Sequence, residues 1–405
     1  MRHLTDSFRL RSGAASSGGL SSAPKAAAFD ATRQLDELVQ AALTARASDV
    51  HFEPKEAGLV VRFRIDGVMT DYRAFAAVER DVLLARMKIF GGLDITEKRL
   101  PQDGRAALRE QGRRINFRVS SLPTVFGESL VLRVLDQAMG ETSFPELGLL
   151  PEQSAMLATA LRAPNGLIYL TGPTGSGKTT TLHAALHALD HGRQAIFTLE
   201  DPVEYEFTAI RQTEIRERIG LTFAACLRAI LRQNPNIILV GETRDAETAQ
   251  LSIRAALTGH LVLSTLHTNS AVAAIPRLRD LGIEPFLLAS ALKLLAGQRL
   301  VRRLCPKCKV LHPDSARLVE HYALGGAQLF QPGGCPGCDH RGYRGREGIF
   351  EIVPVAPLLP LVTAGASLAE LESAALAAGG MTLRTHGLAK AAAGLTSLEE
   401  VLTVL

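Results

Sequence analysis

Residues 172–179 have the spacing G-x-x-x-x-G-K-T, which is typical of a loop that binds a nucleoside triphosphate. Its glycines allow successive backbone N–H groups to converge on phosphate oxygens, and the positive end of a following helix adds to the attraction. Lys178 would reach the β and γ phosphates, and the Thr179 hydroxyl would bind Mg²⁺. The alternative interpretation is a glycine-rich turn with a buried lysine. The residues expected to hold the nucleotide are Gly172, Pro173, Thr174, Gly175, Ser176, Gly177, Lys178, Thr179 and Thr180.

The order of the elements around this loop favours the nucleotide site. An apolar run at 167–170 predicts a strand before the loop, and a helix is expected at 178–189 after it. Strands that alternate with helices predict a parallel α/β sheet, whose functional side chains gather at the carboxyl ends of the strands. The further strands are predicted at 195–199, 237–240 and 261–266, and the further helices at about 222–231 and 245–257.

A polar side chain follows each of the three later strands: Glu200, Glu242 and His267. Phosphoryl transfer to water needs an acid that holds Mg²⁺ or its waters and a group that orients the attacking water. Glu200 and Glu242 can fill these two roles, and the sequence leaves the assignment between them open. His267 could sense the γ phosphate. The alternatives are ordinary solvated loops for the carboxylates and a hydrogen-bonded strand end for the histidine.

Two C-x-x-C pairs, separated by 26 residues, predict a metal site formed by Cys305, Cys308, Cys335 and Cys338. Four thiolates suit tetrahedral Zn²⁺, and a site closed by sulfur on all sides is structural. The alternative is four free thiols that never meet. The fifth cysteine, Cys226, lies in an apolar helical context and is expected in the core.

Composition places the chain among soluble globular proteins of two or three domains, with 405 residues, 46% hydrophobic and 21% charged. No apolar run reaches the roughly 18 residues that span a bilayer, and the start of the chain does not read as a signal peptide. The cysteine usage fits a reduced cytoplasm. A net charge of +4 does not by itself indicate nucleic acid or lipid partners.

The pattern along the chain divides it into segments. Residues 1–28, rich in Ser, Gly and Ala, read as a flexible leader. Residues 29–136 read as a small α+β domain, with a helix from 29, strands at 47–54 and 59–69 that include an Asp66-Gly67 turn, and a second helix at 78–90. Residues 137–150 read as a linker. The nucleotide domain is expected at 151–405, including the cysteine module at 298–350 and helices at 355–405.

The first domain carries arginines on its predicted strands. Arg62 and Arg64 lie two residues apart and share a face of the strand. Arg105, Arg118 and Arg133 follow on later strands. Two interpretations stay open: a solvated face in an arginine-rich protein, or contacts with phosphate in the same chain or a neighbouring one.

Several stretches, taken together, resemble the ATPases of bacterial type II secretion and type IV pilus assembly (GspE/PilB-type). The resemblance runs from about residue 47 to the C-terminus. Retraction motors of the same superfamily usually lack the metal module, which argues against that branch. The matching stretches are TGPTGSGKTTT for the Walker A loop, LEDPVEY for the aspartate box, LRQNPNIILVGETRD for the Walker B segment, TGHLVLSTLHTN for the histidine box, QRLVRRLCPKC with CPGC and GYRGREGIFE for the tetracysteine module, and ASDVHFEP, VRFRIDG, PQDGR and RVSSLPTVFGESLVLRVL for the second N-terminal domain.

The resemblance implies a RecA-like P-loop ATPase domain preceded by a small PAS-like α+β domain. It also implies a homohexamer that binds ATP, Mg²⁺ and Zn²⁺ at the cytoplasmic face of the inner membrane. The partners would be an integral platform protein and a membrane-anchored docking protein, with membrane association through these partners and no nucleic acid. Arg105 and Arg118 match positions that reach ATP phosphates, Glu200 matches the carboxylate thought to polarise water, and Glu242 matches the Walker B carboxylate near Mg²⁺.

Two departures from the family pattern stand out. Asn234, Pro235 and Asn236 occupy positions where the family commonly has Asp-Pro-Asp, and activity is expected to survive because Glu242 remains. The chain has only the leader where relatives place a further N-terminal docking domain, so its recruitment is expected to differ.

Two other classes of protein remain as alternatives. One is a zinc-containing nucleic-acid-binding P-loop protein of DNA uptake or processing, using the basic residues Arg299, Arg302, Arg303, Lys307 and Lys309. The modest net charge and the lack of aromatic stacking residues near these arginines argue against it. The other is a scaffold that binds ATP without hydrolysis, which the polar strand ends disfavour.

Overall fold

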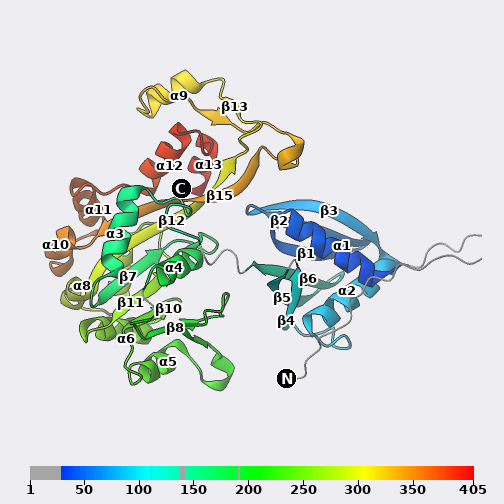
Figure 1. Ribbon diagram of the computed structural model, residues 1–405, viewed down its shortest axis with the longest axis horizontal. Helices are drawn as coiled ribbons and strands as arrows, with labels where there is room; N and C mark the ends of the chain where they lie inside the picture. Colours follow the sequence, from blue (N-terminus) through cyan, green and yellow to red (C-terminus); the bar gives the residue numbers. More distant parts are fainter. Residues whose placement is uncertain (1–28, 111, 137–141, 190–191) are drawn as a thin grey trace, which may run out of the picture.

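The computed structural model describes residues 29–110, 112–136, 142–189 and 192–405, which form two lobes (Figure 1). The predicted leader at 1–28 and the first part of the predicted linker, 137–141, lie outside the described residues. Residues 142–150 form turns that pack on the second lobe. Leu149 is buried there, and the Gly348 N–H donates to the Leu147 carbonyl at 2.9 Å. This part of the predicted linker is therefore held in place.

The N-terminal lobe is a six-stranded antiparallel sheet with two helices against one face, as predicted for a small α+β domain. Helix α1 begins after Asp30, whose carboxylate accepts hydrogen bonds from the Thr32 and Arg33 N–H groups at 3.0 and 3.1 Å. The predicted Asp66-Gly67 turn joins β2 to β3, and both residues have positive φ. The elements are α1 (Ala31–Thr44), β1 (Ala47–Lys55), β2 (Gly58–Ile65), β3 (Val68–Ala76), α2 (Ala77–Gly91), β4 (Gln102–Glu110), β5 (Arg113–Thr124) and β6 (Gly127–Asp136), with the strand order β3-β2-β1-β6-β5-β4.

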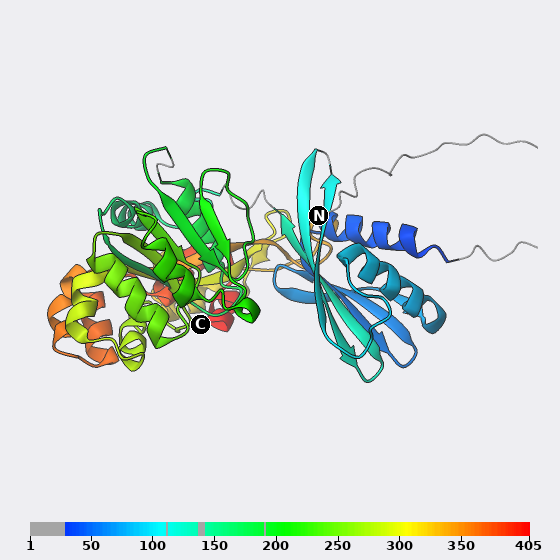
Figure 2. The same cartoon turned by 90° about the horizontal axis from the view of Figure 1, so that it is seen from below.

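The face of this sheet opposite the helices carries a row of arginines. Arg118 on β5 is the register partner of Arg105 on β4 and of Arg133 on β6, so the three side chains stand next to each other. The apolar residues between them, such as Phe117 and Leu132, point to the helices and are buried. In Figure 2 the strands lie between these helices and the second lobe.

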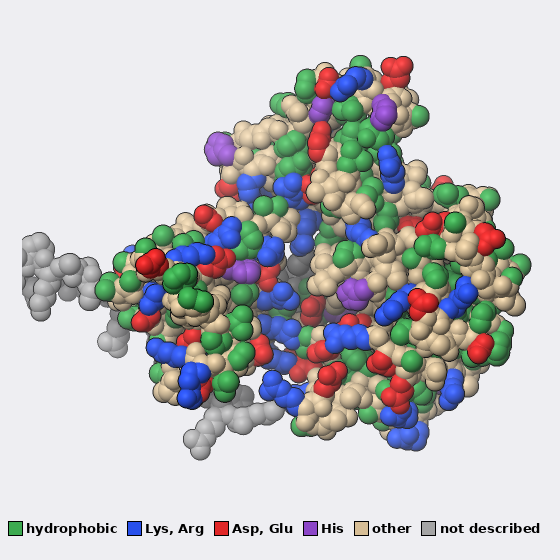
Figure 3. Space-filling model, turned by 180° about the vertical axis from the view of Figure 1, so that it is seen from behind, with side chains coloured by type: hydrophobic (Ala, Val, Ile, Leu, Met, Phe, Trp, Pro, Cys, Tyr) green, Lys and Arg blue, Asp and Glu red, His purple; other side chains and the backbone are tan. Residues whose placement is uncertain are grey.

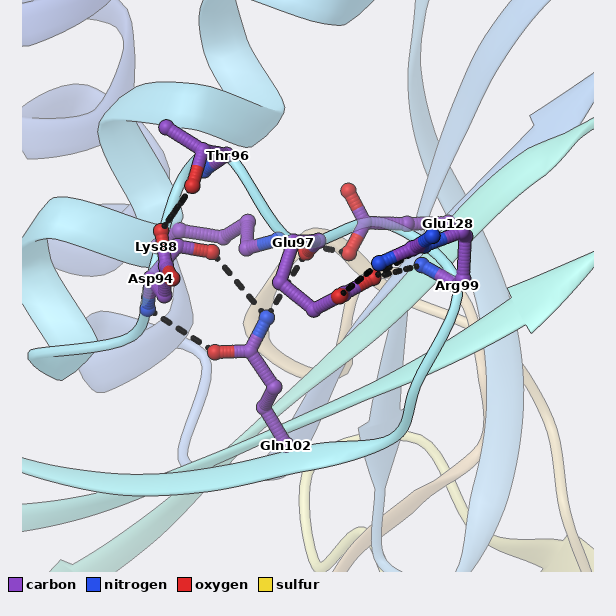
Figure 4. Close-up of polar contacts among 7 residues, drawn as sticks. All are labelled: Lys88, Asp94, Thr96, Glu97, Arg99, Gln102 and Glu128. Atoms are coloured by element: carbon purple, nitrogen blue, oxygen red, sulfur yellow. Dashed lines mark hydrogen bonds and ion pairs between the residues drawn. The ribbon is translucent and has the colours of Figure 1, made fainter.

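Lys88 of α2 fixes the loop that leads into β4. Its ammonium group donates to the Glu97 carbonyl at 2.7 Å and pairs with the Glu128 carboxylate at 2.6 Å (Figure 4). The Gln102 amide donates to the same Glu97 carbonyl at 2.8 Å. Lys88 is 1% exposed, so this is a buried ion pair. The network sets the position at which β4 starts, three residues before Arg105.

The second lobe is built on a seven-stranded sheet of order β15-β12-β7-β11-β10-β8-β9. All neighbouring strands are parallel except β15, which is antiparallel to β12. The predicted parallel α/β sheet is thus confirmed. The central strands are continuous buried apolar runs, as expected for strands covered on both faces. The strands are β7 (Gly166–Thr171), β8 (Ile196–Glu200), β9 (Arg211–Glu214), β10 (Ile237–Val240), β11 (Leu261–Leu266), β12 (Leu292–Leu304) and β15 (Tyr343–Pro354).

Helices cover both faces of this sheet. Leu157 and Leu182 belong to the apolar cluster on one face, and Leu227 and Ile253 belong to the cluster on the other. Cys226 is buried in the second cluster, as predicted. The helices of the first face are α3 (Pro151–Leu161) and α4 (Lys178–His187), and those of the second are α5 (Phe223–Ile230), α6 (Ala246–Leu257), α7 (Ala274–Asp280), α8 (Pro285–Ala291), α10 (Leu359–Thr363) and α11 (Leu368–Ala377).

The cysteine module is an extension of the β12–β15 hairpin. Residues 298–304 and 343–350, which the sequence assigned to the module, belong to these two strands of the main sheet. The tip carries β13 (Val310–Leu311), α9 (Ser315–His321) and β14 (Phe330–Gln331) and projects from the lobe (Figure 1). The last helices, α12 (Leu383–Ala392) and α13 (Leu398–Val404), pack on the hairpin through Val301, Ile349 and Val401. The C-terminal segment is therefore buried against its own sheet.

The lobes contact each other at two described places. The Arg105 guanidinium lies 2.6 Å from the Glu214 carboxylate, and the Gly345 N–H donates to the Asp66 carboxylate at 3.0 Å. No helix among the described residues is long and apolar enough to cross a membrane.

Candidate active site

The phosphate-type loop connects β7 to α4 in the predicted order. Gly172, Gly175 and Gly177 have φ values of 149°, 80° and 87°, in the region that favours glycine. A Cβ on Gly172 would lie 2.6 Å from the Gln298 carbonyl oxygen, so a side chain at this position would collide with β12. Thr174 and Thr179 are exposed on the loop surface. The loop therefore has the glycine-dependent backbone form that allows backbone N–H groups to face a phosphate.

Lys178 is buried at the base of the loop, where its ammonium group donates to the carbonyls of Gly172 at 2.7 Å and Pro173 at 3.0 Å. Burial lowers the pKa of Lys178 to about 8; Glu242 opposes this shift and the charge of Arg299 adds to it. Because burial disfavours the charged form of this lysine, the negative charge of a bound phosphate would stabilise that form and raise its pKa again.

Glu242 and His267, at the ends of β10 and β11, lie beside this lysine. The His267 Nε2 is 3.9 Å from a Glu242 carboxylate oxygen, and Arg244 pairs with the same carboxylate at 2.5 Å. Burial lowers the pKa of His267, with smaller effects from Lys178, Glu242 and Arg244. His267 is therefore neutral at neutral pH. The structure brings together Lys178, Glu242 and His267, as the strand order predicts.

Glu200 ends β8, next to β10, and its side chain is buried. Its carboxylate accepts hydrogen bonds from Thr198 at 2.6 Å, Gln212 at 2.9 Å and His183 at 3.2 Å. Burial alone would raise the pKa of Glu200. The hydrogen bond from His183, the charge of His183, and the hydrogen bonds from Thr198 and Gln212 outweigh it and hold this pKa below its usual value. Glu200 is thus an ionised, hydrogen-bonded carboxylate inside the lobe.

The arginine row of the N-terminal lobe faces the sheet edge that carries Glu200. Glu214, which pairs with Arg105, is the register partner of Glu200 on the neighbouring strand β9. Burial is the largest influence on the pKa of Arg118 and lowers it. The nearby charges of Glu204 and Glu214 oppose this shift. Figure 3 shows Lys and Arg side chains gathered along the junction between the lobes.

Three arginines on the strands of this lobe, one of them from the row, pair with carboxylates of the same lobe. Arg62 pairs with Asp71 at 2.7 Å, and Arg64 lies 3.5 Å from Asp49. Arg133 also pairs with Asp49, at 2.9 Å. Arg62 and Arg64 therefore fit the first interpretation, a solvated face of the domain.

Sequence reasoning assigned no role in this site to Gln298, Arg299, Arg244, Glu214 or His183. The Arg299 guanidinium is buried beside Gly172 and donates to the Asn269 and Gln298 carbonyls, both at 2.9 Å. The Gln298 amide oxygen accepts from Thr181, one turn into α4, at 2.9 Å. Both residues come from β12, whose pairing next to β7 was not predicted. The available signal was the polar pair Gln298-Arg299 inside an apolar run.

Asn234 and Asn236, which precede β10, have local structural roles. Asn234 has a φ of 51°, a conformation that asparagine tolerates better than most residues. The Asn236 side-chain oxygen accepts a hydrogen bond from the Ala195 N–H at 2.7 Å, just before β8. These residues shape the turn between α5 and β10, and Glu242 keeps its place at the strand end.

The four predicted cysteines meet at the tip of the β12–β15 hairpin. Their sulfur atoms all lie within 4.8 Å of one another, and three of the Sγ–Sγ distances are 3.7, 3.8 and 3.9 Å. Tetrahedral zinc with bonds of about 2.3 Å requires sulfur separations of about 3.8 Å. The cluster is thus spaced for a tetrathiolate metal ion and too open for disulfides, and the donor set fits Zn²⁺.

Comparison with known proteins identifies the family. Residues 27–403 match the family described as type II/IV secretion system protein. The chain belongs to this family. Its relatives include the type II secretion system protein HxcR of Pseudomonas aeruginosa, 48% identical over 373 residues that cover 92% of this chain and 76% of HxcR. The type IV pilus assembly ATPase PilB of Myxococcus xanthus is 46% identical over 368 residues, covering 89% of this chain and 65% of PilB.

Solved structures of an ATPase and of a pilus motor share the fold. The Legionella pneumophila ATPase DotB matches with a TM-score of 0.69 over 94% of this chain and 97% of DotB, at 20% identity. The ADP-bound pilus retraction motor PilT matches with a TM-score of 0.60 over 91% of this chain and 96% of PilT, at 26% identity. This member of the type II/IV secretion family is therefore an ATP hydrolase with a P-loop α/β domain and a tetracysteine cluster.

Proposed function

We propose that this secretion ATPase works as a homohexamer whose ATP hydrolysis drives assembly of a pilin-like fibre, either the pseudopilus of type II secretion or a type IV pilus. The observation that carries the proposal is the junction between the lobes. Glu200 and Glu214 end neighbouring strands of the nucleotide domain, and Arg105 reaches that edge from the other lobe. A change in phosphate charge at the site would alter what the arginines contact, so hydrolysis would move one lobe against the other.

The roles in hydrolysis follow from position. The loop Gly172–Thr180 would hold ATP, with Lys178 on the β and γ phosphates and Thr179 on Mg²⁺. Glu242, next to Lys178, would hold Mg²⁺ or its waters, while Glu200 would orient the attacking water. His267 would sense the γ phosphate. Arg105 and Arg118 would neutralise phosphate charge when the lobes close.

The hexamer would bind the cytoplasmic face of the inner membrane through partners, an integral platform protein and a membrane-anchored docking protein. The cysteine cluster would hold one structural Zn²⁺ per chain, because its sulfur spacing suits that ion.

A nucleic-acid function is not proposed, since three of the basic residues named for it, Arg302, Arg303 and Lys309, have partners within the chain. Arg302 pairs with Glu400 at 2.6 Å, and Arg303 lies 3.4 Å from Glu347. The Lys309 ammonium group donates to the Gly394 carbonyl at 2.8 Å. These residues therefore hold the module and the last helices to the sheet.

The deciding experiment measures ATPase activity against oligomeric state for the full chain, with and without DNA and acidic lipid vesicles. We expect activity to rise with assembly, to be independent of DNA, and to disappear in Lys178→Ala. Arg105→Ala is expected to lower hydrolysis, and Arg62→Ala, on the same lobe but paired with Asp71, is the matched control. Equal activity in Arg105→Ala and Arg62→Ala would contradict the role given to Arg105.

A further inference from the structure

His183 is a buried histidine one and a half turns into the helix that follows the phosphate loop. Its side chain is 1% exposed and lies between two aromatic rings that meet it edge-on, Tyr205 at 5.0 Å and Phe207 at 5.4 Å between ring centres. Its Nε2 is 3.2 Å from the Oε2 atom of Glu200. An ionised carboxylate only accepts hydrogen bonds, so the Nε2 atom carries the hydrogen and donates it.

This hydrogen bond is the only one that the His183 ring makes within the described part of the chain. The Nδ1 atom is buried and has no hydrogen-bond partner there. If this position served packing alone, a phenylalanine would fill the space beside Tyr205 and Phe207. It would avoid the cost of a buried ring nitrogen that has no hydrogen-bond partner. The pairing with Glu200 is what the imidazole adds to the site.

The three donors around Glu200 are distributed unevenly between its oxygens. Thr198 and Gln212 both donate to Oε1, at 2.6 and 2.9 Å, while His183 alone donates to Oε2. Each carboxylate oxygen has about two acceptor positions. Oε1 is therefore saturated, and Oε2 keeps one position for a water molecule. The direction of that open position is set by the His183 bond.

We propose that His183 is a positioning residue for ATP hydrolysis, which holds the Glu200 carboxylate so that the open position of Oε2 faces the attacking water. The inference rests on the role proposed above for Glu200. In the reaction, the water oxygen bonds to the γ phosphorus as the bond to the β–γ bridging oxygen breaks. ADP leaves with that electron pair, and the proton of the water passes to Glu200. His183 stays outside the bond changes and acts through the carboxylate.

Two substitutions separate the hydrogen bond from the packing. His183→Phe keeps a flat ring between Tyr205 and Phe207 but removes the donor, whereas His183→Gln places an amide N–H at a similar distance from the backbone as Nε2. We expect His183→Phe to lower kcat about tenfold or more with KM for ATP within about twofold, since small errors in the position of a reacting group are costly. His183→Gln should recover most of kcat. His187→Phe is the matched control, because His187 is exposed one turn further on α4 and also packs on Phe207.

The measurements are kcat, KM and thermal unfolding of the full-length variants, with Glu200→Gln and Lys178→Ala in parallel. Equal losses of kcat in His183→Phe and His183→Gln would overturn the proposal, and so would a loss confined to KM. Wild-type kcat in His183→Phe would also overturn it. If Glu200→Gln keeps wild-type kcat while Lys178→Ala is inactive, the role of Glu200 falls and the proposal falls with it, but the assignment as an ATPase stands.

Discussion

Raising the pH from about 7 to about 9 is expected to weaken ATP binding about tenfold, because Lys178 loses its proton in this range. Its ammonium group is buried, which lowers its pKa to about 8 in the protein without nucleotide. The phosphates of bound ATP stabilise the charged form and raise that pKa. Binding above pH 8 therefore requires uptake of a proton, and the affinity falls as the pH rises.

The magnitude follows from the fraction of protein with a charged lysine. With a pKa of about 8, about nine tenths of the Lys178 side chains are protonated at about pH 7 and about one tenth at about pH 9. Only the protonated fraction pairs with the phosphates, so the apparent Kd rises about tenfold, or about 1.4 kcal/mol. His267 does not contribute to this change, because its lowered pKa leaves it neutral throughout the range.

Isothermal titration with a non-hydrolysable ATP analogue at constant ionic strength measures this Kd. Lys178→Arg is the control, since a guanidinium stays charged across the range. Its affinity, whatever its absolute value, should be flat between about pH 7 and about pH 9. A constant Kd in the unmodified protein, or the same decline in Lys178→Arg, would refute the reasoning.

Two further outcomes are expected from features outside the nucleotide site. Metal analysis of the purified chain should find about one zinc per chain, and chelation should lower the unfolding temperature, because metal binding supplies folding free energy on the order of 10 kcal/mol; protein without zinc would rule out the tetrathiolate site. Lys88→Met should destabilise the chain by about 3 kcal/mol or more in denaturant titrations, since it leaves Glu128 charged and buried. The double variant Lys88→Met/Glu128→Leu should recover stability, and a double variant as unstable as the single one would show that the ion pair is not the cause.

The central strands were predictable because their chemistry is uniform. The runs at 237–240 and 261–266 are apolar throughout and match β10 and β11 as observed, since strands covered on both faces need no polar alternation. The predicted helix at 178–189 ends two residues earlier than expected, with His187. Helix ends depend on local capping, which periodicity does not encode.

Other strands left no such signal. Arg211–Glu214 is a short polar strand at the sheet edge, held by pairing with β8. The run Leu292–Leu304 contains Gly297, Gln298 and three arginines. Because the cysteines follow it directly, its second half was predicted to be part of the cysteine module. Its partner strand begins at Tyr343, beyond the whole insertion. Pairing across such a distance is decided by tertiary contacts and not by local pattern.

The candidate site was predictable at the strand ends and not beyond them. Glu200, Glu242 and His267 follow apolar runs, so topology alone places them at one edge. His183 lies on the helix after the phosphate loop, and Arg299 lies on a strand whose register the sequence does not give. In both cases the spacing of residues in the sequence does not tell which other side chains they contact. Glu214 was not predicted because the strand that carries it was not predicted.

The pairing at the base of the cysteine insertion has a consequence for how such a chain evolves. Leu304 and Tyr343 are register partners on neighbouring strands, and the Cys305 N–H donates to the Gly342 carbonyl at 2.9 Å. The insertion thus leaves the sheet and returns to it at neighbouring positions of two paired strands. A reverse turn of a few residues would close the same hairpin. The cysteine insertion can therefore be lengthened, shortened or removed without any change in the order of the strands that carry the ATPase site.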